Sequence, residues 1–305
     1  MKKWILMGFM ALLAGCQSSP HAERDVAIVA PHGNTSYSLA WLQDNEPDFE
    51  GVDLNIDIAP NAEALAARVL EGIDMAIVPV NMAASLYNKG AGYVVAGVAT
   101  WGNLFVLTTD DDVTGWDDLA STQIYGFGRG LVPGATLEYL LARNNVDTQV
   151  EYLSSPQEVA QALLSGVAQT ALLADEKVTH VLEQSDARVI LDLNEEWGNH
   201  GYPQAVIIVS QTLIDEDPEL VRELLGELET SMDWANQNPA ELGILAASLE
   251  ETADAEIIKN SIQRLNIRFT AAHEAQGQIL EFLEALYSMD PELVGGAVPS
   301  HDFFY

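Results

Sequence analysis

The chain of 305 residues has a single cysteine, Cys16, so no disulfide can form within it. It carries no H-E-x-x-H motif and no G-x-S-x-G motif, and no second thiol is present to act as a nucleophile. The six histidines are scattered and show none of the spacings typical of a metal site. We therefore expect no catalytic residues, no metal ion and no cofactor.

Basic residues are also few, because 13 Lys and Arg stand against 46 Asp and Glu, for a formal charge of −33. Such a chain would repel phosphates, so we expect no nucleic-acid partner. The acidic residues are spread over the whole length. This favours a halophilic surface, because salt near 1 M reduces the Debye length to ~3 Å and screens self-repulsion. The alternative is that the acidic residues create an electrostatic field that steers cationic ligands into a cleft. Hydrophobic residues make up 48%, enough for an ordered core.

Long apolar runs are absent except near the start. Two lysines, an apolar run from Trp4 to Leu13 and two small residues before Cys16 are typical of a signal peptide, here residues 1–15. The sequence Leu-Ala-Gly-Cys resembles a lipobox, so we expect Cys16 to be lipidated and residues 16–25 to form a tether. An ordinary secretory leader that happens to end in cysteine is the alternative.

No later stretch approaches the roughly 20 apolar residues that a helix needs to cross a bilayer. We therefore expect contact with the membrane through the lipid anchor only. The body would then lie in the periplasm or at the cell surface, anchored to a bacterial membrane.

The remaining length, about 290 residues, suggests two lobes rather than one core. Apolar strands alternate with helical patterns, which predicts an α/β fold with mostly parallel sheets. From Leu213 onward the spacing of apolar residues is helical. The tail from Gly295 shows no regular spacing of apolar residues. We expect the aromatic residues of this tail to pack on the body. The predicted strands are Val26–Ala30, Met75–Val78, Tyr93–Ala99, Leu104–Thr108, Gln123–Phe127, Thr170–Leu173, Val189–Leu193 and Ala205–Val209, and the predicted late helices are Asp217–Asn236, Ala240–Leu249, Asp254–Leu265 and Ala272–Ser288.

A weak internal repeat supports two similar lobes. Leu65–Pro79 and Val159–Asp175 each contain an amphipathic helix, a glycine turn and an apolar strand. Asn81 follows the first strand closely, and Asp175 follows the second directly. Because ligands of open α/β sheets bind beyond the carboxyl ends of strands, we predict a cleft between two facing sets of strand ends, with both residues at its edge.

Other polar residues follow predicted strands and are candidate ligand contacts. His32, Asn34 and Thr35 come after the first strand and offer a ring, an amide and a hydroxyl, although capping of the next helix would also explain the last two. Trp101 could stack on a flat ligand or cover a cation, but a core role is the alternative. Tyr202 is a candidate on position alone.

A glycine-rich loop, Gly126–Gly134, follows another predicted strand and precedes a helix. It departs from the dinucleotide motif G-x-G-x-x-G because Leu131 stands at the last glycine. Free backbone N–H groups at such a helix start favour an anionic or polar ligand group, so we include Gly128. Arg129 could clamp a carboxylate, sulfonate or phosphate, and a surface ion pair is the alternative.

Several of these segments carry a family resemblance. Glu71–Pro79 (EGIDMAIVP) is similar to a signature of the periplasmic binding proteins for nitrate, sulfonate, taurine and thiamine pyrimidines. Trp116–Leu119 (WDDL) with the Gly126–Gly134 loop looks like the entry of that group into its second lobe. Gly295–Tyr305 resembles the ending of some members. The resemblance runs loosely from Val26 to the end and depends on the order of the pieces.

This resemblance implies a type II periplasmic-binding-protein fold, with two α/β lobes, a ligand cleft between them and a helical C-terminal segment. Lobe 1 would span residues 26–108 and lobe 2 residues 109–204, with residues 205–305 returning to lobe 1. The chain would cross near Thr108–Val113 and return near Tyr202–Val206.

The implied function is that of a monomeric solute-binding component of an ABC importer, which captures a small organic solute and delivers it to a permease and its ATPase. A ligand-sensing lipoprotein for a membrane receptor and an exported enzyme on the same scaffold are the alternatives. Related enzymes of thiamine biosynthesis rely on a cysteine-rich segment that this chain lacks. The residues leave the solute open among an anion, a flat ring and an amine.

Overall fold

The computed structural model describes residues 21, 23–198, 200–249 and 254–305. The predicted signal peptide, Cys16 and most of the tether lie outside the described residues. His21, from the end of the tether, is fixed on the body, because its Nδ1 is 3.0 Å from Asp217 and its Nε2 is 2.9 Å from Glu223. Among the described helices, none combines the length and the apolar character that crossing a membrane would take.

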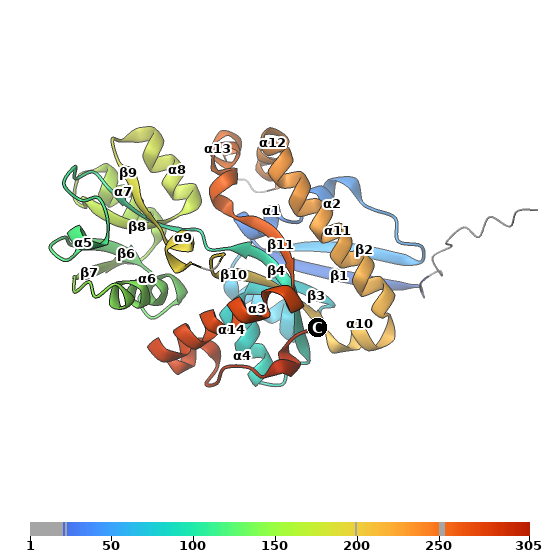
Figure 1. The fold of residues 1–305 in the computed structure, drawn as a ribbon. Helices are drawn as coiled ribbons and strands as arrows, with labels where there is room; N and C mark the ends of the chain where they lie inside the picture. The colour runs from blue at the N-terminus through green and yellow to red at the C-terminus, as the bar shows by residue number, and fades with distance from the viewer. Residues whose placement is uncertain (1–20, 22, 199, 250–253) are drawn as a thin grey trace, which may run out of the picture.

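The chain forms two α/β lobes, which lie side by side in Figure 1. The first lobe contains a six-stranded sheet in the order β11-β4-β10-β3-β1-β2, and the second a five-stranded sheet in the order β7-β6-β8-β5-β9. The strands are β1 (Arg24–Pro31), β2 (Val52–Ala59), β3 (Met75–Pro79), β4 (Tyr93–Trp101), β5 (Leu104–Thr108), β6 (Ile124–Phe127), β7 (Val150–Leu153), β8 (Thr170–Ala174), β9 (Arg188–Asp192), β10 (Pro203–Ser210) and β11 (Ile267–Ala271).

Helices cover both faces of each sheet and form the C-terminal segment. The helices are α1 (Asn34–Tyr37), α2 (Ala40–Asn45), α3 (Ala62–Leu70), α4 (Val80–Asn88), α5 (Trp116–Leu119), α6 (Val132–Arg143), α7 (Pro156–Leu164), α8 (Asp175–Gln184), α9 (Leu193–Trp197), α10 (Gln211–Glu216), α11 (Pro218–Gln237), α12 (Pro239–Leu249), α13 (Ala255–Leu265), α14 (Ala272–Met289), and the 3-10 helices η1 (Pro291–Val294) and η2 (His301–Phe303).

The internal repeat is confirmed at the level of topology. In the first lobe β1 pairs in parallel with both β2 and β3, and in the second lobe β6 pairs in parallel with both β7 and β8. The two repeated segments are α3–β3 and α7–β8. The sheets are mixed rather than mostly parallel, because β5, β10 and β11 all pair antiparallel with their neighbours.

The first crossing between lobes comes earlier than predicted. β4 ends at Trp101 in the first sheet and β5 begins at Leu104 in the second, so the chain crosses at Gly102 and Asn103 rather than at Thr108–Val113. Every residue of β5 is buried, and a fully buried apolar run does not reveal which of two sheets it joins. The return crossing lies between β9 and β10, and it ends at the start of the predicted range Tyr202–Val206, most of which belongs to β10.

The C-terminal segment was predicted to be helical throughout. This is wrong at β11, which joins the first sheet at its edge, antiparallel to β4. The predicted packing of the tail is confirmed for Phe303, which is 1% exposed, and for Phe304, which forms a bridge with Val95 of β4, whereas Tyr305 is 40% exposed.

Alternate residues of the first sheet pack on its two faces, as the period of two in a strand requires. Ile28 and Ile77 join the cluster that contains the buried leucines of α2 and α11, whereas Val29 and Val78 join the cluster beneath α3, α4 and α14. The second cluster continues into the second lobe. The helices that follow β1 and β8, α1 and α8, meet through the hydrogen bond from Tyr37 to Glu176.

Candidate functional site between the lobes

The two lobes touch where α1 follows β1 and α8 follows β8. The hydroxyl of Tyr37 donates a hydrogen bond of 2.8 Å to Oε1 of Glu176, which joins α1 of the first lobe to α8 of the second. Asn34, one helical turn before Tyr37, and Asp175, directly before Glu176, are both predicted ligand contacts. The two predicted residues therefore lie on the two helices that this hydrogen bond joins.

Capping does not explain the polar residues of α1. The N-cap position is Gly33, and no side chain caps the helix. Thr35 is 8% exposed, and its hydroxyl is 3.4 Å from Oδ1 of Asn34, while Nδ2 of Asn34 is buried without a hydrogen-bond partner. His32 is exposed just before the helix. The Asn34 amide is thus available to a ligand rather than used to begin α1.

Asp175 is a buried carboxyl group, with 1% of the residue exposed. Oδ1 accepts a hydrogen bond of 2.8 Å from Nε of Arg264, and Oδ2 has no partner. Burial raises the pKa of Asp175 to about 7, although the Arg264 guanidinium acts in the opposite direction. The desolvation of this carboxylate therefore outweighs its ion pair.

Arg264 belongs to a polar seam between α8 and α13, two helices that Figure 1 places side by side at the top of the molecule. Arg264 also donates to Thr179, and Asn260 donates to Glu183 over 2.9 Å. In addition, the hydroxyls of Thr179 and Ser261 are 2.8 Å apart. The partners on α8 are four residues apart, so they lie on one face of that helix. The seam holds the C-terminal segment against the second lobe.

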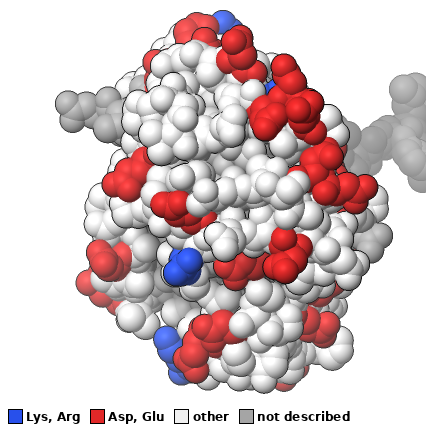
Figure 2. Space-filling view, turned by 90° about the vertical axis from the view of Figure 1, so that its left-hand side faces the viewer, with Lys and Arg blue, Asp and Glu red and all other residues white. Residues whose placement is uncertain are grey.

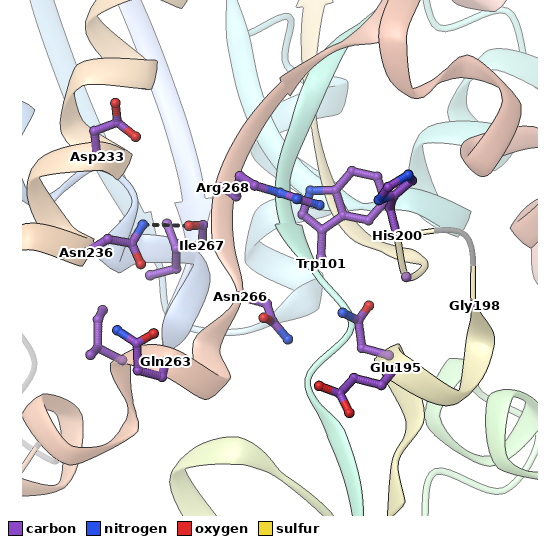
Figure 3. Close-up of a pocket in the computed structure, with 13 residues that line it drawn as sticks. Trp101, Glu195, Gly198, His200, Asp233, Asn236, Gln263, Asn266, Ile267 and Arg268 are labelled. Atoms are coloured by element: carbon purple, nitrogen blue, oxygen red, sulfur yellow. Dashed lines mark hydrogen bonds between the residues drawn. The ribbon is translucent and has the colours of Figure 1, made fainter.

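A pocket of about 750 Å³ opens beside the two crossing segments (Figure 3). Its volume is in the range of small-molecule sites. Of the predicted contacts, Trp101 alone lines it. We call it the hinge pocket, and its lining is Trp101, Asn194, Glu195, Gly198, His200, Gly201, Asp233, Asn236, Ile262, Gln263, Asn266, Ile267 and Arg268.

Trp101 is packed rather than open to a ligand. It is 2% exposed, and the guanidinium of Arg268 lies 4.7 Å from the centre of its ring. Figure 3 shows the ring between the side chains of Arg268 and His200. Burial lowers the pKa of Arg268. A flat ligand would have to displace one of these side chains before it could stack on the indole.

Tyr202 is fully buried at the return crossing. Its ring stacks on Phe282 of α14 with centroids 4.8 Å apart, and it lies 5.4 Å from the ring of Trp197 of α9. Trp197 in turn stacks on Tyr139 of α6. This aromatic cluster joins helices of both lobes, so Tyr202 supports the crossing from within the core.

Asn194 connects the two crossing segments. Its Oδ1 accepts hydrogen bonds from the backbone N–H of Gly102 at 3.0 Å and of Tyr202 at 3.1 Å. Gly102 has no space for a side chain, because a Cβ there would be 2.3 Å from the ring of Tyr202. Asn194 thereby fixes the outgoing and the returning segment relative to each other.

The remaining predicted contacts lie elsewhere. Gly128 and Arg129 border a groove beside β7 whose lining comes entirely from the second lobe. Arg129 is exposed and lies 5.0 Å from the ring centre of Tyr152, so it contacts an aromatic ring rather than the other lobe. Asn81 donates to the carbonyl of Leu293 in η1, which ties α4 to the C-terminal tail.

Residues 48–242, more than half of the chain, match the family model described as NMT1/THI5 like. The chain belongs to the NMT1/THI5-like family. No curated protein matches the chain.

Solved structures share the fold of this NMT1/THI5-like chain. An ABC transporter protein from Parabacteroides distasonis is 24% identical, with a TM-score of 0.81 over 92% of this chain and 98% of its own. The periplasmic aliphatic sulphonate binding protein SsuA of Escherichia coli is 14% identical, with a TM-score of 0.70 over 90% and 92%. The alkanesulfonate-binding protein SsuA of Xanthomonas axonopodis pv. citri, bound to MOPS, is 15% identical, with a TM-score of 0.65 over 92% and 96%. The predicted resemblance and fold are confirmed.

The sequence did not single out Tyr37, Glu176, Asn194, Arg264 or Arg268 as interface residues. Arg264 lies in a helix that the sequence pattern assigned to the C-terminal helical segment. The small number of arginines in the chain was the one feature that could have drawn attention to it. No group of three or more metal-ligating side chains occurs in the part of the chain that the structure describes.

Proposed function

We propose that the chain is the solute-binding component of an ABC importer and captures a small organic molecule between its two lobes. The observation that carries the proposal is the hydrogen bond from Tyr37 on α1 to Glu176 on α8, which joins the two lobes in a chain of the NMT1/THI5-like family. The solved structures of similar fold include proteins described as sulphonate-binding and ABC transporter proteins.

The physical role of such a protein is affinity and delivery rather than chemistry. A solute that contacts both lobes stabilises the closed arrangement, because it interacts more favourably with the closed than with the open arrangement. Delivery to a permease and its ATPase then requires the lobes to separate. The aromatic cluster around Tyr202 and the link made by Asn194 would guide that movement, since both join the crossing segments to the two lobes.

The proposal includes a monomer that a lipid on Cys16 holds at a bacterial membrane, in the periplasm or at the cell surface. Its support is the leader pattern and the position of His21 on α11, which places the end of the tether against the first lobe. Globomycin treatment of an expressing cell should cause the precursor to accumulate, and Cys16→Ser should abolish labelling by a radioactive fatty acid.

Thermal unfolding in the presence of candidate solutes tests the binding role. Residues 17–305 in high salt would be screened against sulfonates, carboxylates, pyrimidines, amines and nucleosides. A ligand at 100 times its dissociation constant adds ~2.7 kcal/mol, and at ~2 °C or more per kcal/mol the midpoint should rise by about 5 °C or more. Recovery of unchanged solute supports a binding protein, whereas chemical alteration of the solute would indicate an enzyme.

A reconstituted transporter distinguishes an importer from a ligand sensor. The loaded protein should stimulate ATP hydrolysis by the permease and ATPase encoded beside it, and the protein without solute should stimulate it less. If the loaded protein changes the activity of a membrane receptor and leaves such an ATPase unaffected, the sensor interpretation replaces the importer.

A further inference from the structure

The polar seam between α8 and α13 contains four hydrogen bonds between side chains of the described residues. The bonded pairs are Arg264 with Asp175 and with Thr179, Ser261 with Thr179, and Asn260 with Glu183. Asp175, Thr179 and Glu183 follow one another in steps of four residues, so the seam uses one face of α8. This face of α8 therefore presents a continuous row of hydrogen-bonding groups to α13.

Apolar packing ties the two helices of the seam to different lobes. Ile258 and Ile262 of α13 are buried in the cluster that contains Ile28 of β1, in the first lobe. Val178 and Val181 of α8 are buried in the other cluster, together with the buried residues of β8 in the second lobe. A rotation of one lobe away from the other would therefore separate α8 from α13 and break the seam.

The bonds of the seam are polar, so water can replace them when the seam opens. Asn260 and Glu183, at one end of it, are already exposed to water. The hydrogen bond of 2.8 Å from Tyr37 on α1 to Glu176 adds another polar link between the same two lobes. One such bond contributes little, because water competes for both partners, but several together hold a two-state equilibrium on one side.

We infer that the seam between α8 and α13 is a latch, which holds the two lobes together before a solute binds. Each of its bonds joins two side chains of this protein, so its contribution does not require a solute. The inference goes beyond the proposed function, because it concerns the resting arrangement of the lobes and not the solute that they capture.

The latch has a consequence for the rates of capture and release. A solute can enter between the lobes only while the latch is open, and a captured solute can leave only when it opens again. The fraction of time that the latch is open therefore limits both steps, and a weaker latch accelerates both.

Spin labels on the two lobes measure the resting arrangement directly. Residues 17–305 include every described residue and no cysteine, so introduced cysteines are the only sites of labelling. Asp44→Cys on α2 and Asp186→Cys just after α8 replace exposed residues, one on each lobe. With no solute added, double electron–electron resonance should give one predominant distance, which matches the separation of these positions in the structure after allowance for the labels.

The double variant Thr179→Val and Asn260→Ala opens the latch with little disturbance of packing. It removes three of the four bonds, and valine keeps the volume of the threonine. Ser261 keeps a partner, because its hydroxyl also donates to the carbonyl of Ile257 over 2.6 Å. We expect the open fraction to increase about tenfold or more, with a second, longer distance between the labels.

Thr136→Val is the matched control, because Thr136 is a buried threonine of the same lobe. Its hydroxyl donates to the carbonyl of Val132 within α6, over 2.8 Å, and makes no printed bond across the seam. This variant should leave the distance distribution unchanged. Circular dichroism of every labelled protein identifies any variant that has failed to fold.

The result that supports the latch is one predominant short distance in the parent and in Thr136→Val, and a longer distance in the double variant. A parent that shows mainly the longer distance with no solute added would overturn the inference. The same holds if the double variant gives the distribution of the parent. Neither result bears on the binding role, which the thermal screen tests separately.

Discussion

Asp175 is the residue at which burial, charge and position combine. It directly follows β8, where the repeat in the sequence placed a polar group at the end of a buried strand. The fold then removes it from water and places Arg264 beside one oxygen. Desolvation raises the pKa of the carboxyl group to about 7, so the folded protein holds a proton there more tightly than an exposed aspartate would.

This pKa predicts a dependence of stability on pH. The folded-state pKa lies above the ordinary value of 3.8, so the contribution of Asp175 is fully present below about pH 4 and is lost as the pH rises through 7. Between pH 5 and pH 8 the free energy of unfolding should fall by about 2 kcal/mol more in the parent than in Asp175→Asn. Urea titrations of both proteins across this range check it, and parallel pH profiles would contradict it.

Gly102 offers a second prediction at this scale. A methyl group there would meet the ring of Tyr202 and the amide of Asn194 inside the crossing, so Gly102→Ala should lower the free energy of unfolding by about 1–3 kcal/mol. Gly226→Ala is the control, because Gly226 lies within α11 with open space at its Cβ. That change should raise stability by about 0.5–1 kcal/mol. Similar effects of the two substitutions in chemical denaturation would refute the tight crossing.

At the scale of secondary-structure elements, the contact between α8 and α13 links the second lobe to the C-terminal segment. It joins a helix of the second lobe to a helix of the C-terminal segment through side chains, and Arg264 and Thr179 each take part in two of its hydrogen bonds. Because one partner of its ion pair is buried, removal of the other leaves an uncompensated charge rather than an empty space.

Arg264→Met should therefore destabilise the protein by about 3 kcal/mol at pH 8, where Asp175 is ionised, and by clearly less at pH 5, where it is protonated. The double variant with Asp175→Asn should recover part of the loss at pH 8. Guanidinium denaturation at both pH values measures this. A loss that is the same at pH 5 and pH 8, or no recovery in the double variant, would show that Arg264 acts by packing.

Strong periodic elements were predictable, whereas three of the four edge strands were not. The bounds of α11 to α14 fall within one or two residues of the predicted helices, because long helical patterns are distinctive and proline marks the starts of α11 and α12. The strands β2, β7 and β11 were missed. They lie at sheet edges, where fewer residues are buried, although β2 does show the alternation of apolar and polar residues that is typical of a half-buried strand.

At the scale of the whole molecule the charge stands out. Figure 2 shows acidic side chains over the face of the second lobe, with basic ones few and scattered. The formal charge of −33 on a compact body favours unfolding through self-repulsion at low ionic strength. The halophilic interpretation remains a prediction, and stability in salt tests it.

The midpoint of thermal unfolding should rise by about 10 °C or more between 0.1 M and 1 M NaCl, because the Debye length falls from ~10 Å to ~3 Å. Sucrose at equal osmolality is the control, since it is excluded from the surface without screening charge. If sucrose raises the midpoint as much as salt does, solvent exclusion rather than screened repulsion accounts for the stability.

The candidate site was predictable in part. Asn34 and Asp175 could be named because both follow strands whose carboxyl ends meet in an open α/β sheet. Position beside a strand did not distinguish them from Asn81, Arg129 and Tyr202, which the fold directs to the tail, to an aromatic ring and into the core.

The sequence by itself determined the alternation of strands and helices, the repeated helix–strand unit, the family and the acidic surface, because each depends on local periodicity, motif order or composition. Tertiary structure alone decided where the chain crosses between lobes and which polar atoms remain unpaired there. Arg264 meets Asp175 across 89 positions of the chain, and Tyr37 meets Glu176 across 139. Such pairings depend on how two lobes pack, which no local pattern encodes.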